Sequence, residues 1–259
     1  MSNLHDAFAK AKSENRAALI GYLPAGYPSK QGAVDCISAM VRGGVDIVEI
    51  GLPYSDPVMD GPTIQAAVEQ SLKQGTKIKD VVETASEVSK LGVPALVMSY
   101  WNPIEANGVN KFASDLANAG GVGVITPDLT PEEAGDWIDA SDGKLDRVFL
   151  VALSSTNERI ATVCKVTTGF IYAGAVMGVT GARATISDSV QDLVSRTRKH
   201  TDLPIAVGLG VSTPAQAKEI AQYADGVIVG SAFVNAIEQG GPAAAQKLAS
   251  ELAGALSKA

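Results

Sequence analysis

The sequence predicts a single α/β domain with the (β/α)8 (TIM) barrel fold and additional helices at both ends. Short apolar, β-branched runs occur eight times, and stretches with helical spacing lie between them. A similar phrase, in which small residues lead into an apolar run, recurs at 44–48, 121–125 and 225–229. The length of 259 residues suits eight such units, whereas a doubly wound sheet normally has fewer strands and a glycine-rich turn after the first.

The elements follow one another in regular alternation. The apolar runs predict strands at 18–23, 47–50, 95–98, 122–125, 148–153, 169–172, 205–207 and 227–229. Helical spacing predicts helices at 33–41, 64–72, 78–91, 112–119, 190–198 and 215–223. A further helix is expected within the N-terminal segment, and the alanine-rich segment 242–256 predicts a closing surface helix. No linker rich in Ser, Pro or Gly divides the chain, so residues 1–259 are expected to form one domain.

Composition and charge exclude several classes of protein. Apolar residues make up 46% and charged residues 19%, which suits a chain with a sizeable core rather than a disordered one. Lys and Arg number 21 against 28 Asp and Glu, for a net charge of -7 without a basic cluster, so no nucleic-acid binding is expected. No apolar run approaches the roughly 20 residues of a membrane helix, and the N-terminus is unlike a secretory signal. We therefore expect a cytoplasmic protein without membrane attachment.

Cysteine and histidine usage limits the chemistry. Cys36 and Cys164 lie far apart and outside any C-x-x-C motif, so we expect small buried side chains rather than a disulfide. His5 and His200 are the only histidines. The sequence therefore offers no histidine cluster for zinc or iron and no histidine for a catalytic triad, and we expect no metal site.

The most informative segment is EIGLPYSDPVMDGPTIQ, which begins at Glu49 and spans residues 49–65. Barrels place their active sites at the C-terminal ends of the strands, and this segment runs from the second predicted strand into its loop. Strand alternation puts Glu49 on one face with Val45 and Ile47. If the opposite face, Val48 and Ile50, meets the helices, Glu49 points into the barrel mouth. Burial would then raise its pKa towards neutrality, as suits a group that both donates and accepts a proton.

Each carboxylate also has a structural alternative. For Glu49 the alternative is a buried ion pair, but no predicted strand ends in Lys or Arg. Arg147 precedes the fifth predicted strand, at the opposite face of the barrel, so a functional role is favoured. Taken alone, Asp60 favours an ordinary Asp-Gly-Pro turn, and Asp56 before proline is compatible with an Asx turn.

Two glycine-containing loops are candidates for phosphate binding. GLGVSTP at 208–214 follows the seventh predicted strand, and Gly230-Ser231 follows the eighth; each opens a helix. Backbone N–H groups of these two loops commonly bind phosphate in this fold, which needs no basic cluster. The alternative is that the glycines only make tight turns. Residues 173–187, which are spaced with glycines, suggest either a mobile lid or a static surface loop.

Taken together, these motifs resemble the alpha chain family of tryptophan synthase almost from end to end. The segment 49–65 is the most specific, and GVTG at 178–181, VGLGVS at 207–212 and VGSA at 229–232 follow in the same order. The resemblance implies a barrel lyase that cleaves indole-3-glycerol phosphate into indole and glyceraldehyde 3-phosphate. It also implies a pyridoxal-phosphate (PLP) dependent beta subunit that receives the indole for L-tryptophan synthesis, in a heterotetramer of two alpha and two beta chains. The cofactor is expected in that partner and none in this chain.

The resemblance also assigns site residues by motif. Glu49 matches the acid/base glutamate, and Asp60 matches the aspartate that faces the indole nitrogen. The matched substrate contacts are Tyr22 and Tyr100 in the lining of the indole pocket, Tyr172 before the lid glycines, Thr180 in the lid, and Gly181, Gly210, Gly230 and Ser231 around the phosphate.

A retro-aldol cleavage leaves electrons on the released carbon, and enzymes usually hold them with a lysine Schiff base or a metal. Lys165 precedes the sixth predicted strand, at the wrong face, so we expect the indole ring to accept the electrons after protonation at C3. Two alternatives stay open. One is another phosphate-binding barrel enzyme, such as a ribulose-phosphate epimerase or an indole-3-glycerol phosphate synthase, which normally use histidine-bound metal and strand-borne lysines, respectively. The other is a non-catalytic phosphate-binding barrel that only activates a partner subunit.

Overall fold

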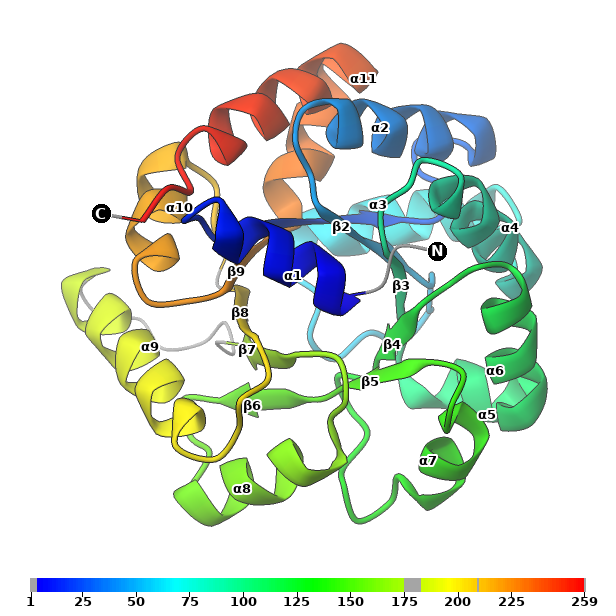
Figure 1. The fold of residues 1–259 in the computed structure, drawn as a ribbon. Coiled ribbons are helices and arrows are strands. Elements are labelled where there is room, and N and C mark those ends of the chain that lie inside the picture. Colours follow the sequence, from blue (N-terminus) through cyan, green and yellow to red (C-terminus); the bar gives the residue numbers. More distant parts are fainter. Residues whose placement is uncertain (1–3, 175–182, 209, 259) are drawn as a thin grey trace.

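The computed structural model describes residues 4–174, 183–208 and 210–258. Its strands form one parallel sheet that curls into a ring with helices around it, which confirms the predicted (β/α)8 barrel (Figure 1). The order around the ring is β5-β4-β3-β2-β1-β9-β8-β7-β6. The strands are β1 (Ala18–Pro24), β2 (Ile47–Gly51), β3 (Ala95–Met98), β4 (Gly123–Ile125), β5 (Asp146–Val148), β6 (Leu150–Ala152), β7 (Ile171–Gly174), β8 (Ile205–Gly208) and β9 (Gly226–Val229).

The predicted strand at 148–153 consists of two segments and begins earlier than expected. β5 pairs with β4, β6 pairs with β7, and Phe149 lies between them. The N–H of Tyr172 donates to the Phe149 carbonyl at 3.2 Å, so β5 and β6 together fill one position and close the ring. Arg147, expected before the strand, lies inside β5. Its guanidinium donates to the Val166 carbonyl and to Ser141 Oγ, at the N-terminal end of the barrel as expected.

Helices alternate with the strands, and every predicted helical range overlaps a helix. The helices are α1 (Leu4–Ser13), α2 (Lys30–Arg42), α3 (Pro62–Lys73), α4 (Ile78–Ser89), α5 (Trp101–Asn107), α6 (Val109–Asn118), α7 (Gly135–Ser141), α8 (Asn157–Val166), α9 (Arg183–Arg198), α10 (Pro214–Ala221) and α11 (Ser231–Ala253). α5, α7 and α8 lie outside the predicted ranges. Among the helices described, none has the length and hydropathy needed to cross a bilayer.

Strand alternation divides the core into two layers. Ile20, Ile47 and Leu96 face the barrel interior, whereas Val48 and Ile50 pack beneath the helices. This sorting confirms the predicted faces of β2. Val45, which was expected on the Glu49 face, is an exception, because it precedes the strand and joins the helix-side core.

The two ends of the chain complete the barrel. α1 lies across the centre of the ring in Figure 1 and closes its N-terminal end, where the Phe8 and Phe170 rings are 5.6 Å apart. α11 packs against α2 and bends at Gly240 and Gly241 before Pro242. The helix expected from 242 onwards is therefore the second half of α11. Both additional terminal helices are therefore present.

Candidate active site

A cavity of about 180 Å³ lies at the C-terminal ends of the strands, where the fold predicts the active site. It brings together seven of the ten site residues expected from the sequence: Tyr22, Glu49, Asp60, Tyr172, Gly210, Gly230 and Ser231. Thr180 and Gly181 lie outside the described residues. Tyr100 is not among the described residues that line the cavity, although it contacts Asp60.

Glu49 is the most deeply buried charged group of the cavity. It lies near the end of β2, paired with Tyr22 of β1 and Leu96 of β3, and its side chain is 0% exposed. Within the described part of the chain, neither of its carboxylate oxygens has a hydrogen-bond partner. Desolvation by burial raises the pKa of Glu49 from 4.5 to about 8. Nothing described supports the ion-pair alternative, and the carboxyl group holds its proton at neutral pH.

Tyr22 and Tyr172 lean across neighbouring strands beside Glu49. A Cβ atom built on Gly51 would lie 2.3 Å from the Tyr22 hydroxyl oxygen, and one built on Gly208 would lie 2.3 Å from that of Tyr172. Both positions therefore need glycine, because any side chain would push the ring away. Burial raises the pKa of both tyrosines, so their hydroxyl groups stay neutral.

Asp60 enters the cavity from the loop between β2 and α3. The Tyr100 hydroxyl donates to Asp60 Oδ1 at 3.1 Å, and the backbone N–H of Met59 donates to the same Tyr100 oxygen at 2.9 Å. Burial raises the pKa of Asp60, and the hydrogen bond from Tyr100 opposes that rise. The carboxylate thus bonds across the barrel mouth rather than only within its own turn, so a purely local turn role for Asp60 is not supported.

The helix that follows β9 begins at the edge of the cavity. Gly230 is the N-cap of α11, and no side chain caps this helix. Gly230 and Ser231 line the cavity at the start of this helix, where the helix dipole favours an anion. The N-terminus of α10 differs, because Thr213 and Gln216 form a capping box there. Gly210, with φ +62, is the part of the β8 loop that reaches the cavity.

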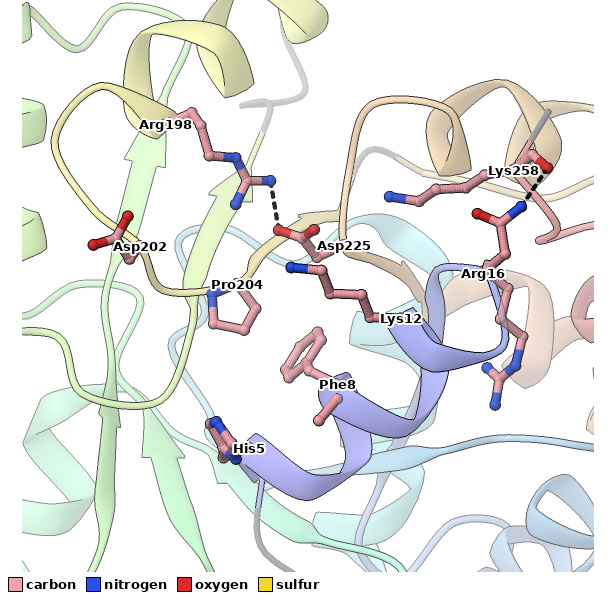
Figure 2. Close-up of a pocket in the computed structure, with 11 residues that line it drawn as sticks. His5, Phe8, Lys12, Arg16, Arg198, Asp202, Pro204, Asp225 and Lys258 are labelled. Carbon is pink, nitrogen blue, oxygen red and sulfur yellow. Dashed lines mark hydrogen bonds and ion pairs between the residues drawn. The ribbon is translucent and has the colours of Figure 1, made fainter.

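A larger cavity of about 580 Å³ lies at the N-terminal end of the barrel, beside α1 (Figure 2). Its arginines are engaged in ion pairs, Arg198 with Asp225 and Arg16 with Asp46. Charged groups at this end of a barrel usually serve stability. Among the residues described, no group of three or more His, Cys, Asp or Glu side chains is arranged to hold a metal ion. The smaller cavity, with its unpaired carboxyl group, is therefore the candidate active site.

Sequence comparison decides the family. A model of the family described as "Tryptophan synthase alpha chain" matches residues 8–258. The chain belongs to the tryptophan synthase alpha chain family. The alpha chain of Nocardia farcinica is 56% identical over 97% of this chain and 95% of its own length, and that of Thermobifida fusca is 55% identical over 90% and 88%. A structure of Mycobacterium tuberculosis tryptophan synthase superposes with a TM-score of 0.94 at 50% identity, covering 100% of this chain and 99% of that one.

Membership of the tryptophan synthase alpha chain family confirms the resemblance seen in the sequence. The role of the family, and of this chain within it, is that of the lyase subunit of tryptophan synthase in tryptophan biosynthesis. Sequence reasoning missed five apolar residues that line the cavity, Met59, Ile64, Met98, Leu150 and Ile228. Strand alternation carries the signal for two of them, since Met98 and Leu150 lie two positions beyond the interior residues Leu96 and Val148.

Proposed function

We propose that Glu49 and Asp60 are the catalytic residues of indole-3-glycerol phosphate cleavage, and that the substrate phosphate binds at the N-terminus of α11. One observation carries the proposal. Glu49 is a fully buried carboxyl group without a described hydrogen-bond partner, in the same cavity as Asp60 and an uncapped helix N-terminus. A proton donor, a second carboxylate and an anion site are the three groups that this cleavage needs.

The chemistry follows from the protonation state of each group. Glu49, whose burial raises its pKa to about 8, gives its proton to C3 of the indole ring. The ring becomes cationic, and Asp60 stabilises its N–H. The bond between C3 and the glycerol carbon then breaks, and its electron pair restores the aromatic ring. The hydroxyl on that glycerol carbon loses its proton to a carboxylate, and the carbon becomes the aldehyde group. Each acid/base step of this kind contributes about 10²- to 10⁴-fold.

Indole release by the purified chain tests this function. We expect indole and glyceraldehyde 3-phosphate to appear in equal amounts from indole-3-glycerol phosphate, measured by chromatography without any partner present. A non-catalytic barrel that only activates a partner would release neither product. A chain of the epimerase or synthase type would leave this substrate uncleaved, so either result would contradict the proposal.

The partner surface is proposed to lie beside the cavity, on the loop that carries Asp60. Val58 is 77% exposed and Met59 is 42% exposed, and large apolar residues exposed at one place commonly mark a protein interface. We propose that a PLP-dependent beta subunit docks there, in a complex of two alpha and two beta chains. Solved structures of tryptophan synthase support this partner. The stoichiometry rests on the family resemblance, and the expected cytoplasmic location rests on the sequence, in which no apolar run has the length of a membrane helix and the N-terminus is unlike a secretory signal. In this proposal PLP belongs to the partner.

Replacing Val58 by aspartate is expected to weaken the complex, because a charge would lose its hydration at the interface. Co-elution with the beta subunit on size-exclusion chromatography measures the effect, and a change at Pro57 should act in the same direction. Leu91→Asp is the matched control, since Leu91 is 38% exposed but lies after α4 at the N-terminal end of the barrel. Equal co-elution of Val58→Asp and Leu91→Asp would argue against this surface.

A further inference from the structure

The Tyr100 hydroxyl touches the Asp60 carboxylate, yet Tyr100 is not among the described residues that line the cavity. Tyr100 follows β3 as the N-cap residue of α5 and is only 7% exposed. Its ring packs against that of Tyr54, with centroids 5.6 Å apart. Tyr100 is anchored by its place directly after β3, whereas Tyr54 and Asp60 both belong to the loop between β2 and α3.

Two hydrogen bonds fix the direction of the Tyr100 proton. A backbone N–H can only donate, so the hydroxyl oxygen accepts from Met59 at 2.9 Å. The single hydroxyl proton is then free to be donated to Asp60 Oδ1, at 3.1 Å. A donor aimed at a carboxyl oxygen favours its ionised form, which opposes the effect of burial on the pKa of Asp60.

Described contacts also hold the loop around Asp60 at its two ends and at Tyr54, whose hydroxyl donates to Asn102 Oδ1 at 3.5 Å. At its start, the Leu52 N–H donates to the Met98 carbonyl at 2.8 Å. At its end, Gln65 Nε2 donates to the backbone carbonyl of Asp60 at 2.8 Å. The exposed residues Val58 and Met59 lie between these points. The Tyr100 hydroxyl thus links the middle of the loop, backbone and carboxylate together, to the barrel wall.

We propose that Tyr100 is a positioning residue, whose hydroxyl hydrogen bond holds Asp60 directed into the cavity without touching the substrate itself. This inference rests on the role proposed above for Asp60. It differs from the assignment by family resemblance, in which Tyr100 lines the indole pocket. The two roles have different kinetic consequences. Loss of a uniform substrate contact raises KM, whereas loss of an interaction that acts through Asp60 lowers kcat.

The test is Tyr100→Phe in the full chain, which keeps the ring and removes the hydroxyl. We expect kcat for indole-3-glycerol phosphate cleavage to fall about tenfold or more, with KM within about threefold of wild type. Without the hydrogen bond the pKa of Asp60 rises, so the acid limb of the kcat–pH profile moves to higher pH. Tyr27→Phe is the control, because Tyr27 is also a buried tyrosine but lies outside the cavity lining, and its profile should match wild type.

The other outcomes overturn the inference. A higher KM at unchanged kcat would show direct contact with the substrate, and a lower kcat with an unmoved acid limb would show only a general loss of structure. If turnover is too low for a profile, NMR titration of carbon-labelled aspartate must show a higher pKa for Asp60 in Tyr100→Phe. Full activity of Asp60→Asn would instead refute the catalytic role of Asp60. An inactive Asp60→Asn with an unchanged Tyr100→Phe would refute the positioning role alone.

Discussion

Replacing Glu49 by glutamine is expected to lower kcat for indole-3-glycerol phosphate cleavage by about 10²- to 10⁴-fold for each proton transfer in which Glu49 takes part. Glutamine keeps the shape of the side chain but has no acidic proton for C3 of the indole ring. The phosphate site proposed at the start of α11, at Gly230 and Ser231, is not altered by this change. Affinity for the product glyceraldehyde 3-phosphate should therefore stay within about threefold of wild type, an effect below about 1 kcal/mol.

Single-turnover kinetics and product binding by calorimetry separate the two effects. Glu105→Gln is a suitable control, since Glu105 is an exposed glutamate on α5 outside the cavity lining and should retain wild-type turnover. Cleavage by Glu49→Gln within tenfold of wild type would remove Glu49 from the chemistry. Parallel loss of activity and of product affinity would point to a damaged cavity instead.

The second large effect concerns stability. Burial raises the pKa of Glu49 to about 8 in the folded chain, while the unfolded chain titrates near 4.5. Between these values the folded state binds more protons than the unfolded state, so the free energy of unfolding falls as pH rises. From pH 5 to pH 8 this group alone lowers stability by roughly 3 kcal/mol, because each pKa unit corresponds to about 1.4 kcal/mol.

Glutamine at position 49 removes this dependence, since it does not titrate. The stability of Glu49→Gln relative to wild type should therefore grow between about pH 5 and pH 8, as measured by urea unfolding at both values. All other titrating groups are shared, so the difference between the two proteins isolates Glu49. Parallel pH dependence of the two proteins would show that the carboxyl group is not desolvated in solution.

The position of Glu49 could be predicted because it depends on a local rule. Side chains alternate along a strand, so the apolar residues Val48 and Ile50 define the helix side and leave Glu49 for the interior. The number of barrel units could be predicted for the same reason, since each apolar run is local. α8 was not predicted, although Ile160, Val163 and Cys164 recur at helical spacing behind the N-cap Thr156.

Other features depend on contacts that no local pattern encodes. Tyr100 meets Asp60 across 40 positions of sequence, and the meeting depends on the path of the loop between β2 and α3. The break between β5 and β6 at Phe149 arises where one continuous apolar run has different partners on its two sides. α5 and α7 have seven residues each, which is too short for a periodic pattern to emerge.

The glycines beneath the two leaning tyrosines also constrain how this scaffold can be diversified. Gly51 and Tyr22 come from adjacent strands, as do Gly208 and Tyr172, and in each pair a larger residue at one position demands a smaller ring at the other. Libraries that randomise these sites one at a time will consist mostly of variants in which a new side chain clashes with the tyrosine ring. Redesign for a bulkier or smaller heterocycle therefore has to exchange each glycine and its tyrosine as a coupled pair.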